Sequence, residues 1–412
     1  MSDYRKLGDV SFAVKDKING IKDANLKYIG LEHLDSSSSY LNGYAEPSVS
    51  ISTNSVFKSG DTIFGKLRPN LRKSVLAPFD GYCSTDLLVL RSADDVVPEY
   101  AARVFQSESV FRCAEETAVG TKMPRTSWAQ LRQLKVFCPE QAEQKTIANI
   151  LDTLDTQIRQ TEAIIAKLQQ VKQGLLHDLL TRGIDANGQL RPPRDQAPEL
   201  YKESPLGWIP REWELHELQS LSSKIVDGTH FTPTYTDSGV PFLRVTNVQS
   251  RTIDPTKTKY ISKAEHSFLT ARCAPQKGDI LLSKNGTVGI AKLVDWDWEF
   301  SIFVSLAMIR LVDPEKTNPS YVTSVLNSNV LKLQIQNRSK QGTVINLHLE
   351  EIREFLMPVP GRDEQDQITA AIRKFEQKLF SEEKTLGKLK KQKSGLMDDL
   401  LTGRVRVNSG AC

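Results

Sequence analysis

The chain is poor in the features that mark zinc-binding, membrane and secreted proteins. It has only five cysteines, with no CxxC pair and no Cys/His spacing suited to a metal. The most apolar stretch, 300–311, is interrupted by serines and is too short to span a bilayer. The first ten residues carry charges where a signal peptide needs an apolar core. Because scattered free cysteines also suit a reducing compartment, we expect a cytoplasmic protein without zinc.

Charge of one sign is equally scarce. Lysine and arginine number 54 against 50 aspartates and glutamates, which gives a formal net charge of +4. This balance permits a nucleic-acid partner without arguing for one, so local clusters must decide. With 412 residues, 39% hydrophobic and 25% charged, the chain is expected to form two or more ordinary globular domains.

Catalytic signatures are missing as well. There is no HExxH motif, and LLSKNGTVGI at 281–290 lacks the spacing of a P-loop. The string NPSY at 318–321 resembles a loop with which amino-methyltransferases hold a target base, but no glycine-rich loop for a methyl donor accompanies it. The first half has VPEY at 97–100 in the equivalent place. Pro98 and Pro319 are therefore interpreted as the first residues of helices.

Two Gly-Asp pairs come nearest to a nuclease site. Such a site needs clustered carboxylates around a metal with a lysine nearby. Asp61 precedes Lys66, and Asp279 precedes Lys284. A turn between two strands explains each Gly-Asp pair more simply, so we predict no catalytic centre and no metal site.

What the chain does contain is an internal repeat. Residues 139–183 match 360–404 at an offset of 221, including the run Asp-Leu-Leu-Thr near the end of each copy. Apolar residues recur in alternating steps of three and four through both copies, which predicts two long coiled-coil helices. Polar interruptions coincide, Thr161 with Glu382 and Lys172 with Lys393, and such groups fix register. The predicted helix seam comprises Leu151, Leu154, Ile158, Ile165, Leu168, Leu175 and Leu179 in the first copy, and Ile372, Phe375, Leu379, Leu386, Leu389, Leu396 and Leu400 in the second.

The segments before these helices are related more loosely. FKSGDTIFGKLRPN at 57–70 parallels PQKGDILLSKNGTVG at 275–289, and YIGLEHLD at 28–35 parallels FLRVTNVQ at 242–249. Short alternating apolar runs separated by turn residues predict twisted sheet with a few helices, an α+β fold. The predicted order is a recognition domain at 1–140, a spacer helix at 141–183, a linker at 184–206, a second recognition domain at 207–360 and a second spacer helix at 361–407.

Polar residues gather in loops at matching positions of the two halves. KLRPNLRKS at 66–74 holds four cations without an acid, and a loop of this kind presents its charges to phosphates and its amides to base edges. For any one residue a solvated charge is the simpler interpretation, but the coincidence of the loops favours the set. The predicted DNA-binding residues are Lys66, Arg68, Asn70, Arg72, Lys73, Lys122, Arg125, His230, Arg244, Asn247, Lys284, Asn285, Arg338, Lys340 and Asn346.

Several strings together resemble the specificity subunit of type I restriction–modification systems. GWIPREW at 207–213 opens the second half, and VFCPEQAEQKTIANIL at 136–151 and LMPVPGRDEQDQITAAI at 356–372 open the helices. GLLHDLLTRGI at 174–184 and GLMDDLLTGRVRV at 395–407 close them. The resemblance covers nearly the whole chain, although the first half has no GWIP string at its start.

The resemblance implies a non-catalytic DNA-specificity subunit. Each of two target recognition domains would read one half of a split, asymmetric double-stranded DNA site, and the two helices would pack antiparallel as a pseudo-symmetric coiled-coil spacer. Two methyltransferase subunits would bind the helices, and restriction subunits would complete the complex. S-adenosylmethionine would be bound by the methyltransferase and ATP and magnesium by the restriction subunit, with no cofactor on this chain.

Two other classes of function stay open from the residues alone. A stand-alone methyltransferase or nuclease would modify or cut DNA as the purified chain. A scaffold that joins proteins through its coiled coil would not bind duplex DNA, whereas a DNA-reading protein would bind it with a steep dependence on salt.

Overall fold

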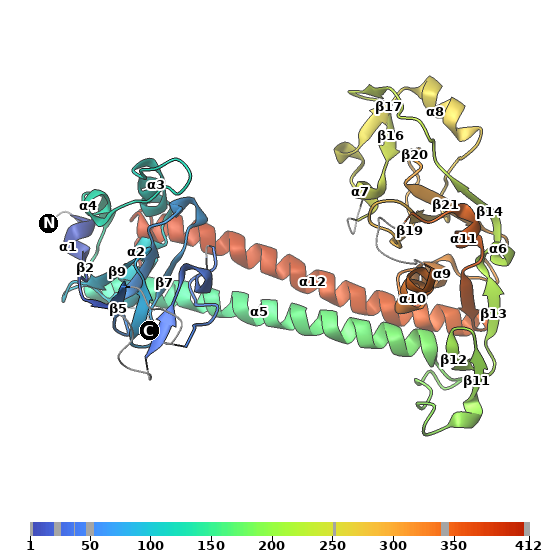
Figure 1. The fold of residues 1–412 in the computed structure, drawn as a ribbon, viewed down its shortest axis with the longest axis horizontal. Helices are drawn as coiled ribbons and strands as arrows, with labels where there is room; N and C mark the ends of the chain where they lie inside the picture. Colours follow the sequence, from blue (N-terminus) through green and yellow to red (C-terminus); the bar gives the residue numbers. More distant parts are fainter. Residues whose placement is uncertain are drawn as a thin grey trace. The chain divides into compact units, whose positions relative to one another are not determined.

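The computed structural model describes residues 3–19, 26–36, 38–46, 53–249, 253–338 and 346–407. The chain divides into two compact units (Figure 1). Unit 1 comprises Met1–Ile165 with Ser381–Cys412, and unit 2 comprises Ala166–Phe380. Among the described residues, no helix combines the length and the apolar character needed to cross a bilayer.

Unit 1 combines short strands and helices with the first part of one long helix and, from Ser381 onward, the last part of another, α12 (Arg362–Leu401). Its elements are β1 (Tyr4–Lys6), α1 (Leu7–Val10), β2 (Ser11–Ala13), β3 (Lys17–Asn19), β4 (Lys27–Ile29), η1 (Leu31–His33), β5 (Thr53–Phe57), β6 (Thr62–Gly65), η3 (Pro69–Leu71), β7 (Ser74–Leu76), β8 (Gly81–Ser84), β9 (Leu87–Ser92), α2 (Pro98–Phe105), α3 (Glu108–Glu116), α4 (Trp128–Leu131), β10 (Lys135–Phe137) and the first part of α5 (Gln141–Thr181).

Unit 2 holds the second set of elements. They are η4 (Pro198–Leu200), β11 (Tyr201–Ser204), β12 (Gly207–Pro210), β13 (Glu214–Glu217), α6 (Leu218–Leu221), β14 (Ser222–Asp227), β15 (Tyr235–Thr236), β16 (Val240–Leu243), α7 (Val245–Val248), η5 (Pro255–Lys257), β17 (Lys259–Ile261), α8 (Lys263–Thr270), β18 (Ile280–Ser283), β19 (Ala291–Leu293), β20 (Ser301–Ile302), β21 (Leu306–Leu311), α9 (Pro319–Leu326), α10 (Asn329–Arg338), α11 (Leu349–Arg353), β22 (Leu356–Val359) and the first part of α12 (Arg362–Leu401). Helix and sheet are mixed in both units, as the α+β prediction requires.

The same four-stranded antiparallel sheet, here called sheet I, occurs in each unit. Its strand order is β2-β9-β6-β7 in unit 1 and β14-β21-β18-β19 in unit 2. The Gly-Asp pairs form the turns before β6 and β18. Asp61 and Asp279 are buried there, and each accepts two hydrogen bonds from an arginine on the neighbouring strand, Arg91 and Arg310, at 2.7–2.8 Å. The two aspartates therefore hold a turn to a sheet.

The second sheet, sheet II, differs between the units. Each contains a parallel pair, β4 with β8 in unit 1 and β16 with β20 in unit 2. The antiparallel strands β3 and β5 join this pair through β8, whereas β15 and β17 join it through β16. The extra strands therefore extend opposite members of the parallel pair in the two units.

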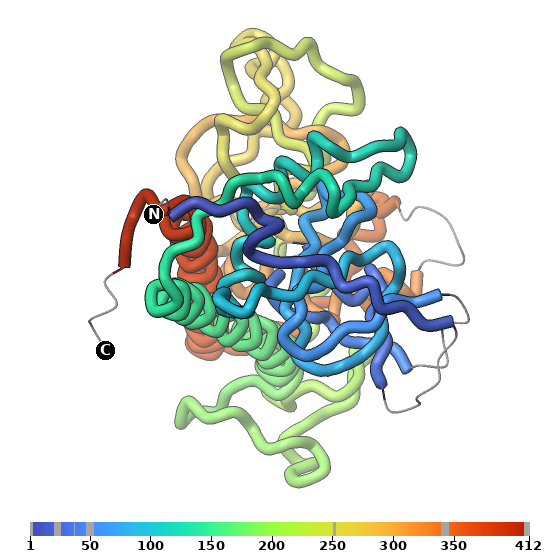
Figure 2. Tube along the Cα trace, turned by 90° about the vertical axis from the view of Figure 1, so that its left-hand side faces the viewer, coloured from blue at the N-terminus to red at the C-terminus, as the bar shows by residue number. Residues whose placement is uncertain are grey.

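The two long helices follow the predicted seam. In unit 1 the first part of α5 lies beside the last part of α12 in both views (Figures 1 and 2). Asp155 pairs with Lys393 at 2.5 Å and Glu162 with Lys390 at 2.8 Å. As the residue numbers increase along α5, the numbers of their partners on α12 decrease. The segments are thus antiparallel, and every predicted seam residue is buried or half-buried.

Each unit packs its core against the start of one helix and the end of the other. In unit 1, Ile147 and Leu151 from α5 join Leu400 and Leu401 from α12 around α2. In unit 2 the four positions shifted by 221 do the same around α9. They are Ile368, Ile372, Leu179 and Leu180.

The repeated Glu-Gln dipeptide explains how each recognition fold is attached to its helix. Gln144 accepts a hydrogen bond from the backbone N–H of Val97, just before α2, and Gln365 accepts the same bond from Asn318 before α9, both at 2.8 Å. Helices α2 and α9 begin at Pro98 and Pro319, as predicted.

The glutamate of the dipeptide binds the segment that follows the other helix. Glu143 accepts hydrogen bonds from Arg406, and Glu364 accepts them from Arg191. After α5 the chain turns at Gly183, whose φ of +67° favours glycine, and a Cβ there would collide with Glu364 and a tryptophan ring. The repeat therefore preserves a way of closing each unit, in addition to the helix seam.

Candidate nucleic-acid interface

The predicted DNA-binding residues fall mainly on three loops in each unit. Loop A comprises residues 30–35 in unit 1 and 244–249 in unit 2. Loop B comprises 66–73 and 284–289. Loop C comprises 118–126 and 338–347, of which 339–345 lie outside the described residues.

Hydrogen bonds bring the three loops of unit 1 together. The Lys73 ammonium of loop B donates to the backbone carbonyl of Leu31 in loop A at 2.9 Å. The backbone N–H of Arg68 donates to the carbonyl of Pro124 in loop C at 2.8 Å, and the N–H of Thr126 donates to the carbonyl of Lys66 at 3.0 Å. Polar residues far apart in the sequence therefore share one surface.

Three of the predicted cations of unit 1 serve as internal braces in this structure. Lys73 is bound to loop A as described. Arg72 makes two hydrogen bonds to Glu108, at 2.5 and 2.9 Å, and lies 3.5 Å from Glu115. Arg125 donates to Asp86 at 3.0 Å. A cation already neutralised by a carboxylate adds less to the attraction of phosphates than a free one.

The remaining polar residues of unit 1 face solvent more openly. Arg68, Asn70 and Lys122 are exposed, and Lys66 is half-buried. Among the described residues, the side chains of Arg68 and Lys122 have no ion-pair partner. These four residues, three cations and one amide, form the accessible polar part of the candidate interface in unit 1.

Loop B of unit 1 also has an unusual backbone. Arg68 and Arg72 have φ values of +49° and +52°, and they are the two non-glycine residues with positive φ among those described. Left-handed backbone at a non-glycine residue costs on the order of 1 kcal/mol and is concentrated at functional sites. The arrangement holds the 3₁₀ turn Pro69–Leu71 between the two arginines.

The loops of unit 2 are joined in the same manner but carry different side chains. Gln249 of loop A donates to the Thr287 hydroxyl of loop B at 2.8 Å. The N–H of Leu347 in loop C donates to the carbonyl of Lys284 at 2.9 Å. Asn247 accepts a hydrogen bond from the N–H of Arg244 and so caps α7, as the ring of His33 caps η1 in unit 1.

Asp227, at the end of β14, binds two cations of unit 2, Lys284 and Arg272, and the ring of His230. Its buried carboxylate pairs with Lys284 at 2.9 Å, Arg272 at 2.6 Å and His230 at 3.2 Å. Lys284 is itself buried, whereas the side chains of Arg272 and His230 are more than half exposed. Burial alone would raise the pKa of the Asp227 carboxyl, but the hydrogen bonds from Lys284 and His230 outweigh it, and its pKa is lowered.

Two predicted residues of unit 2 have buried polar atoms without a hydrogen-bond partner among the described residues. They are Nε of Arg244 and Oδ1 of Asn285, on loops A and B. Buried polar atoms are normally satisfied, so such atoms need a partner from outside. An arginine and an asparagine are also side chains that pair with guanine and adenine edges.

Of the three predicted residues in loop C of unit 2, one is bonded to other protein groups and one is exposed. The Arg338 guanidinium donates to the carbonyl of Glu351 at 2.7 Å and lies 5.1 Å from the ring of Phe355, so it braces α10 against α11. Asn346 is exposed. Lys340 lies outside the described residues.

Sequence reasoning missed several residues of this surface. A hydrogen bond between Gln249 and Thr287 joins loops A and B, and Asp227 forms an ion pair with Lys284 of loop B. Asp227 stands three residues before His230 in the string DGTH, which is the one signal that could have indicated it. Among the described residues, no group of three or more His, Cys, Asp or Glu side chains is arranged to hold a metal ion.

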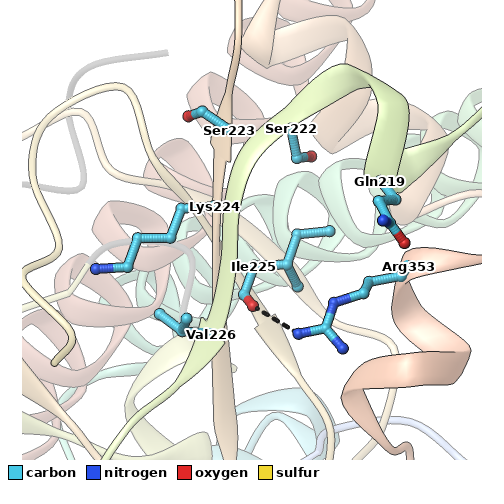
Figure 3. Close-up of a pocket in the computed structure, with 7 residues that line it drawn as sticks. All are labelled: Gln219, Ser222, Ser223, Lys224, Ile225, Val226 and Arg353. Atoms are coloured by element: carbon cyan, nitrogen blue, oxygen red, sulfur yellow. Dashed lines mark hydrogen bonds between the residues drawn. The ribbon is translucent and has the colours of Figure 1, made fainter.

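A cavity of about 330 Å³ lies elsewhere in unit 2, along the free edge of β14 (Figure 3). Arg353 points into it and donates to the carbonyl of Ile225 at 3.4 Å, while Lys224 lies on the other side of the strand. Cations on an exposed edge strand discourage pairing with another strand. None of its lining residues belongs to loops A–C, so the cavity is separate from the candidate interface.

Comparisons with known proteins agree with this geometry. The family model described as type I restriction modification DNA specificity domain matches residues 5–170 and 210–391. A putative type I restriction enzyme MjaX specificity subunit from Methanocaldococcus jannaschii is 24% identical over 85% of this chain and 79% of its own length. The EcoBI specificity subunit of Escherichia coli is 24% identical over 57% of this chain and 50% of its own length.

Solved structures show the same fold at low identity. A type I restriction–modification S subunit from M. genitalium matches with a TM-score of 0.58 and 15% identity over 97% of this chain and 95% of its own. A chain from a structure of type I restriction–modification complex assembly matches with a TM-score of 0.61 and 18% identity over 98% of both chains. The match to the family model covers most of the sequence and contains both loop sets. The chain belongs to the family of type I restriction–modification DNA specificity subunits, which recognise a DNA site and are not catalytic.

Proposed function

We propose that this subunit reads a bipartite, asymmetric double-stranded DNA site, one part with the loops of unit 1 and the other with those of unit 2. The observation that carries the proposal is that both units join loops A, B and C by hydrogen bonds, yet place different side chains on them. Unit 1 offers Arg68, Lys122 and Lys66, whereas unit 2 offers chiefly Asn285, Asn346 and Arg244. Two interfaces of different chemistry would read different bases.

The long helices are proposed to set the gap between the two parts of the site. Helix α5 has 41 residues and α12 has 40, which corresponds to about 60 Å each at roughly 1.5 Å per residue. One turn of duplex is about 34 Å. The gap would then be at least about a turn of DNA.

The chemistry is proposed to reside in partner subunits. Two methyltransferase subunits would bind the helices, modify adenine and hold S-adenosylmethionine, and restriction subunits would hold ATP and magnesium. A target base flipped out of the duplex would enter the methyltransferase pocket. The assembly would work in the cytoplasm.

A matched deletion tests the spacer role. Removing one heptad from each helix, 160–166 and 381–387, keeps the apolar seam in phase and shortens each helix by about 10 Å, or roughly three base pairs. The methyltransferase complex of the variant should methylate a site whose gap is shorter by that amount, mapped by methylome sequencing. An unchanged gap would refute the spacer role, and a chain that binds no duplex DNA would instead be a protein scaffold.

A further inference from the structure

Loop C of unit 1 displays two apolar side chains at its tip. Val119 is 73% exposed and Met123 is 47% exposed. The loop is a hairpin, in which Val119 and Arg125 exchange two backbone hydrogen bonds of 3.0 Å. The turn between them contains Gly120, with φ +113°, and Pro124.

The hairpin is braced from outside. The N–H of Arg68 binds the Pro124 carbonyl, and the N–H of Thr126 binds the Lys66 carbonyl. The Arg125 guanidinium bonds to Asp86 on the β8–β9 turn and, at 3.4 Å, to the carbonyl of Met123. These bonds fix the backbone so that the apolar tip stands away from the core. A tip held in this way loses little conformational entropy on binding.

The surroundings of the tip are cationic. Lys122 adjoins Met123, and Arg68 lies on the neighbouring loop B; both are exposed. Asp86, a carboxylate bonded to the hairpin, is neutralised by Arg125. An apolar tip with exposed cations on its own loop and on the adjoining loop complements a partner that is anionic outside and apolar inside. Duplex DNA fits this description, with phosphates around a stack of bases.

We propose that Met123 is a wedge that inserts part-way between adjacent base pairs of the half-site read by unit 1, while Lys122 and Arg68 contact the flanking phosphates. The inference rests on the proposed DNA-reading role of loops B and C. Methionine is unbranched and polarizable, so it adapts to a narrow gap, and apolar wedges of this size unstack a base step and kink the duplex. Flexible pyrimidine–purine steps deform most easily, so the wedge selects such a step without a base-edge hydrogen bond.

The test uses the subunit assembled with its methyltransferase partners and duplexes that carry 2-aminopurine at one position at a time across the methylated site. Binding of the wild type should raise the fluorescence at one step of the unit 1 half-site. Met123→Ala should abolish that rise and weaken binding by roughly tenfold, the effect of removing a buried methionine side chain. Met123→Leu should restore both. Leu333→Ala, which removes an apolar side chain that is 57% exposed in unit 2, is the matched control and should change neither.

Three outcomes separate the possibilities. If Arg68→Ala and Lys122→Ala weaken DNA binding but Met123→Ala changes neither fluorescence nor affinity, the wedge is wrong and the proposed interface stands. If none of the three variants weakens binding, the interface itself is wrong. If Met123→Ala instead reduces retention of the methyltransferase subunits in the absence of DNA, the tip is a protein contact and the wedge is overturned.

Discussion

Units 1 and 2 have the same frame and different surfaces. Sheet I, the Asp61–Arg91 and Asp279–Arg310 pairs and the Glu-Gln dipeptides recur position by position. Sheet II is extended on opposite sides of its parallel pair, and the loops carry the exposed cations Arg68 and Lys122 in unit 1 but chiefly amides in unit 2. The Glu-Gln contacts that attach each recognition fold to its helix are therefore the same in both units, whereas the residues on the loops differ.

The ion pairs along the helices show a second difference. Lys393 and Lys172 occupy equivalent seam positions and pair with equivalent carboxylates, Asp155 and Glu376. In unit 1 Asp155 is buried and Lys393 half-buried, and the pair is joined by Arg103 of α2, which also binds Asp152. In unit 2 the residue equivalent to Arg103 is Ser324. Burial alone would raise the pKa of Asp155, but Arg103 and Lys393 lower it. Unit 1 thus joins α2 to both long helices through an ion-pair cluster, here called the charged lock, whereas the equivalent Ser324 of unit 2 bonds within its own helix, to the carbonyl of Ser320.

Breaking that lock should have the largest effect. Arg103→Met leaves Asp152 and Asp155 without their buried partner, and removing one member of a buried ion pair costs about 3–5 kcal/mol. Chemical denaturation should show this loss in the free energy of unfolding, with unit 1 unfolding first. The matched variant Ser324→Ala in unit 2 should change the free energy of unfolding by less than about 1 kcal/mol. Equal losses in the two variants would contradict the asymmetry.

The dependence of DNA affinity on salt concentration should distinguish the loops of unit 1 from those of unit 2. Arg68→Ala with Lys122→Ala should reduce the slope of log K against log salt by about one for each phosphate that the protein no longer neutralises. Asn285→Ala with Asn346→Ala should leave the slope unchanged and weaken discrimination at the unit 2 half-site, by about 1–3 kcal/mol for each base that these amides read. Titrations of specific and scrambled duplexes at several salt concentrations measure both. A salt slope that falls equally in both double variants would remove the distinction.

The sequence predicted the common frame better than the surfaces. The 221-residue repeat predicts the two helices and their seam, since these depend on local periodicity, whereas the antiparallel pairing is implied only by the family resemblance. The role of individual cations depends on partners distant in the chain. Arg72 meets Glu108, Lys73 meets the Leu31 carbonyl and Arg125 meets Asp86, at separations of 36, 42 and 39 residues. No pattern in KLRPNLRKS distinguishes the braced Arg72 and Lys73 from the exposed Arg68. The altered pairing in sheet II also depends on long-range contacts.

Acid should affect unit 2 through Asp227. Because the folded pKa of this carboxyl is lowered, its stabilisation is present above the unfolded value of about 3.9 and is lost as the pH falls through the lower folded value. The groups that face it are Lys284, Arg272 and His230. Asp227→Asn should flatten the pH dependence of unfolding in that acidic window. A variant with the same slope as the wild type would show that Asp227 gains nothing from its cations.

The smallest expected effect compares the two seam lysines. Lys172→Met removes a partly exposed pair with Glu376 and should change the free energy of unfolding by less than about 1 kcal/mol, the usual range for exposed ion pairs. Lys393→Met removes a half-buried cation from the buried Asp155 but leaves Arg103 in place, so its cost should exceed that of Lys172→Met and stay below that of Arg103→Met. Denaturant titrations of the three variants give the ranking. If Lys172→Met instead lowered the free energy of unfolding more than Lys393→Met, the seam ion pair of unit 2 would contribute more to stability than that of unit 1. The charged lock would then not explain a difference between the two units.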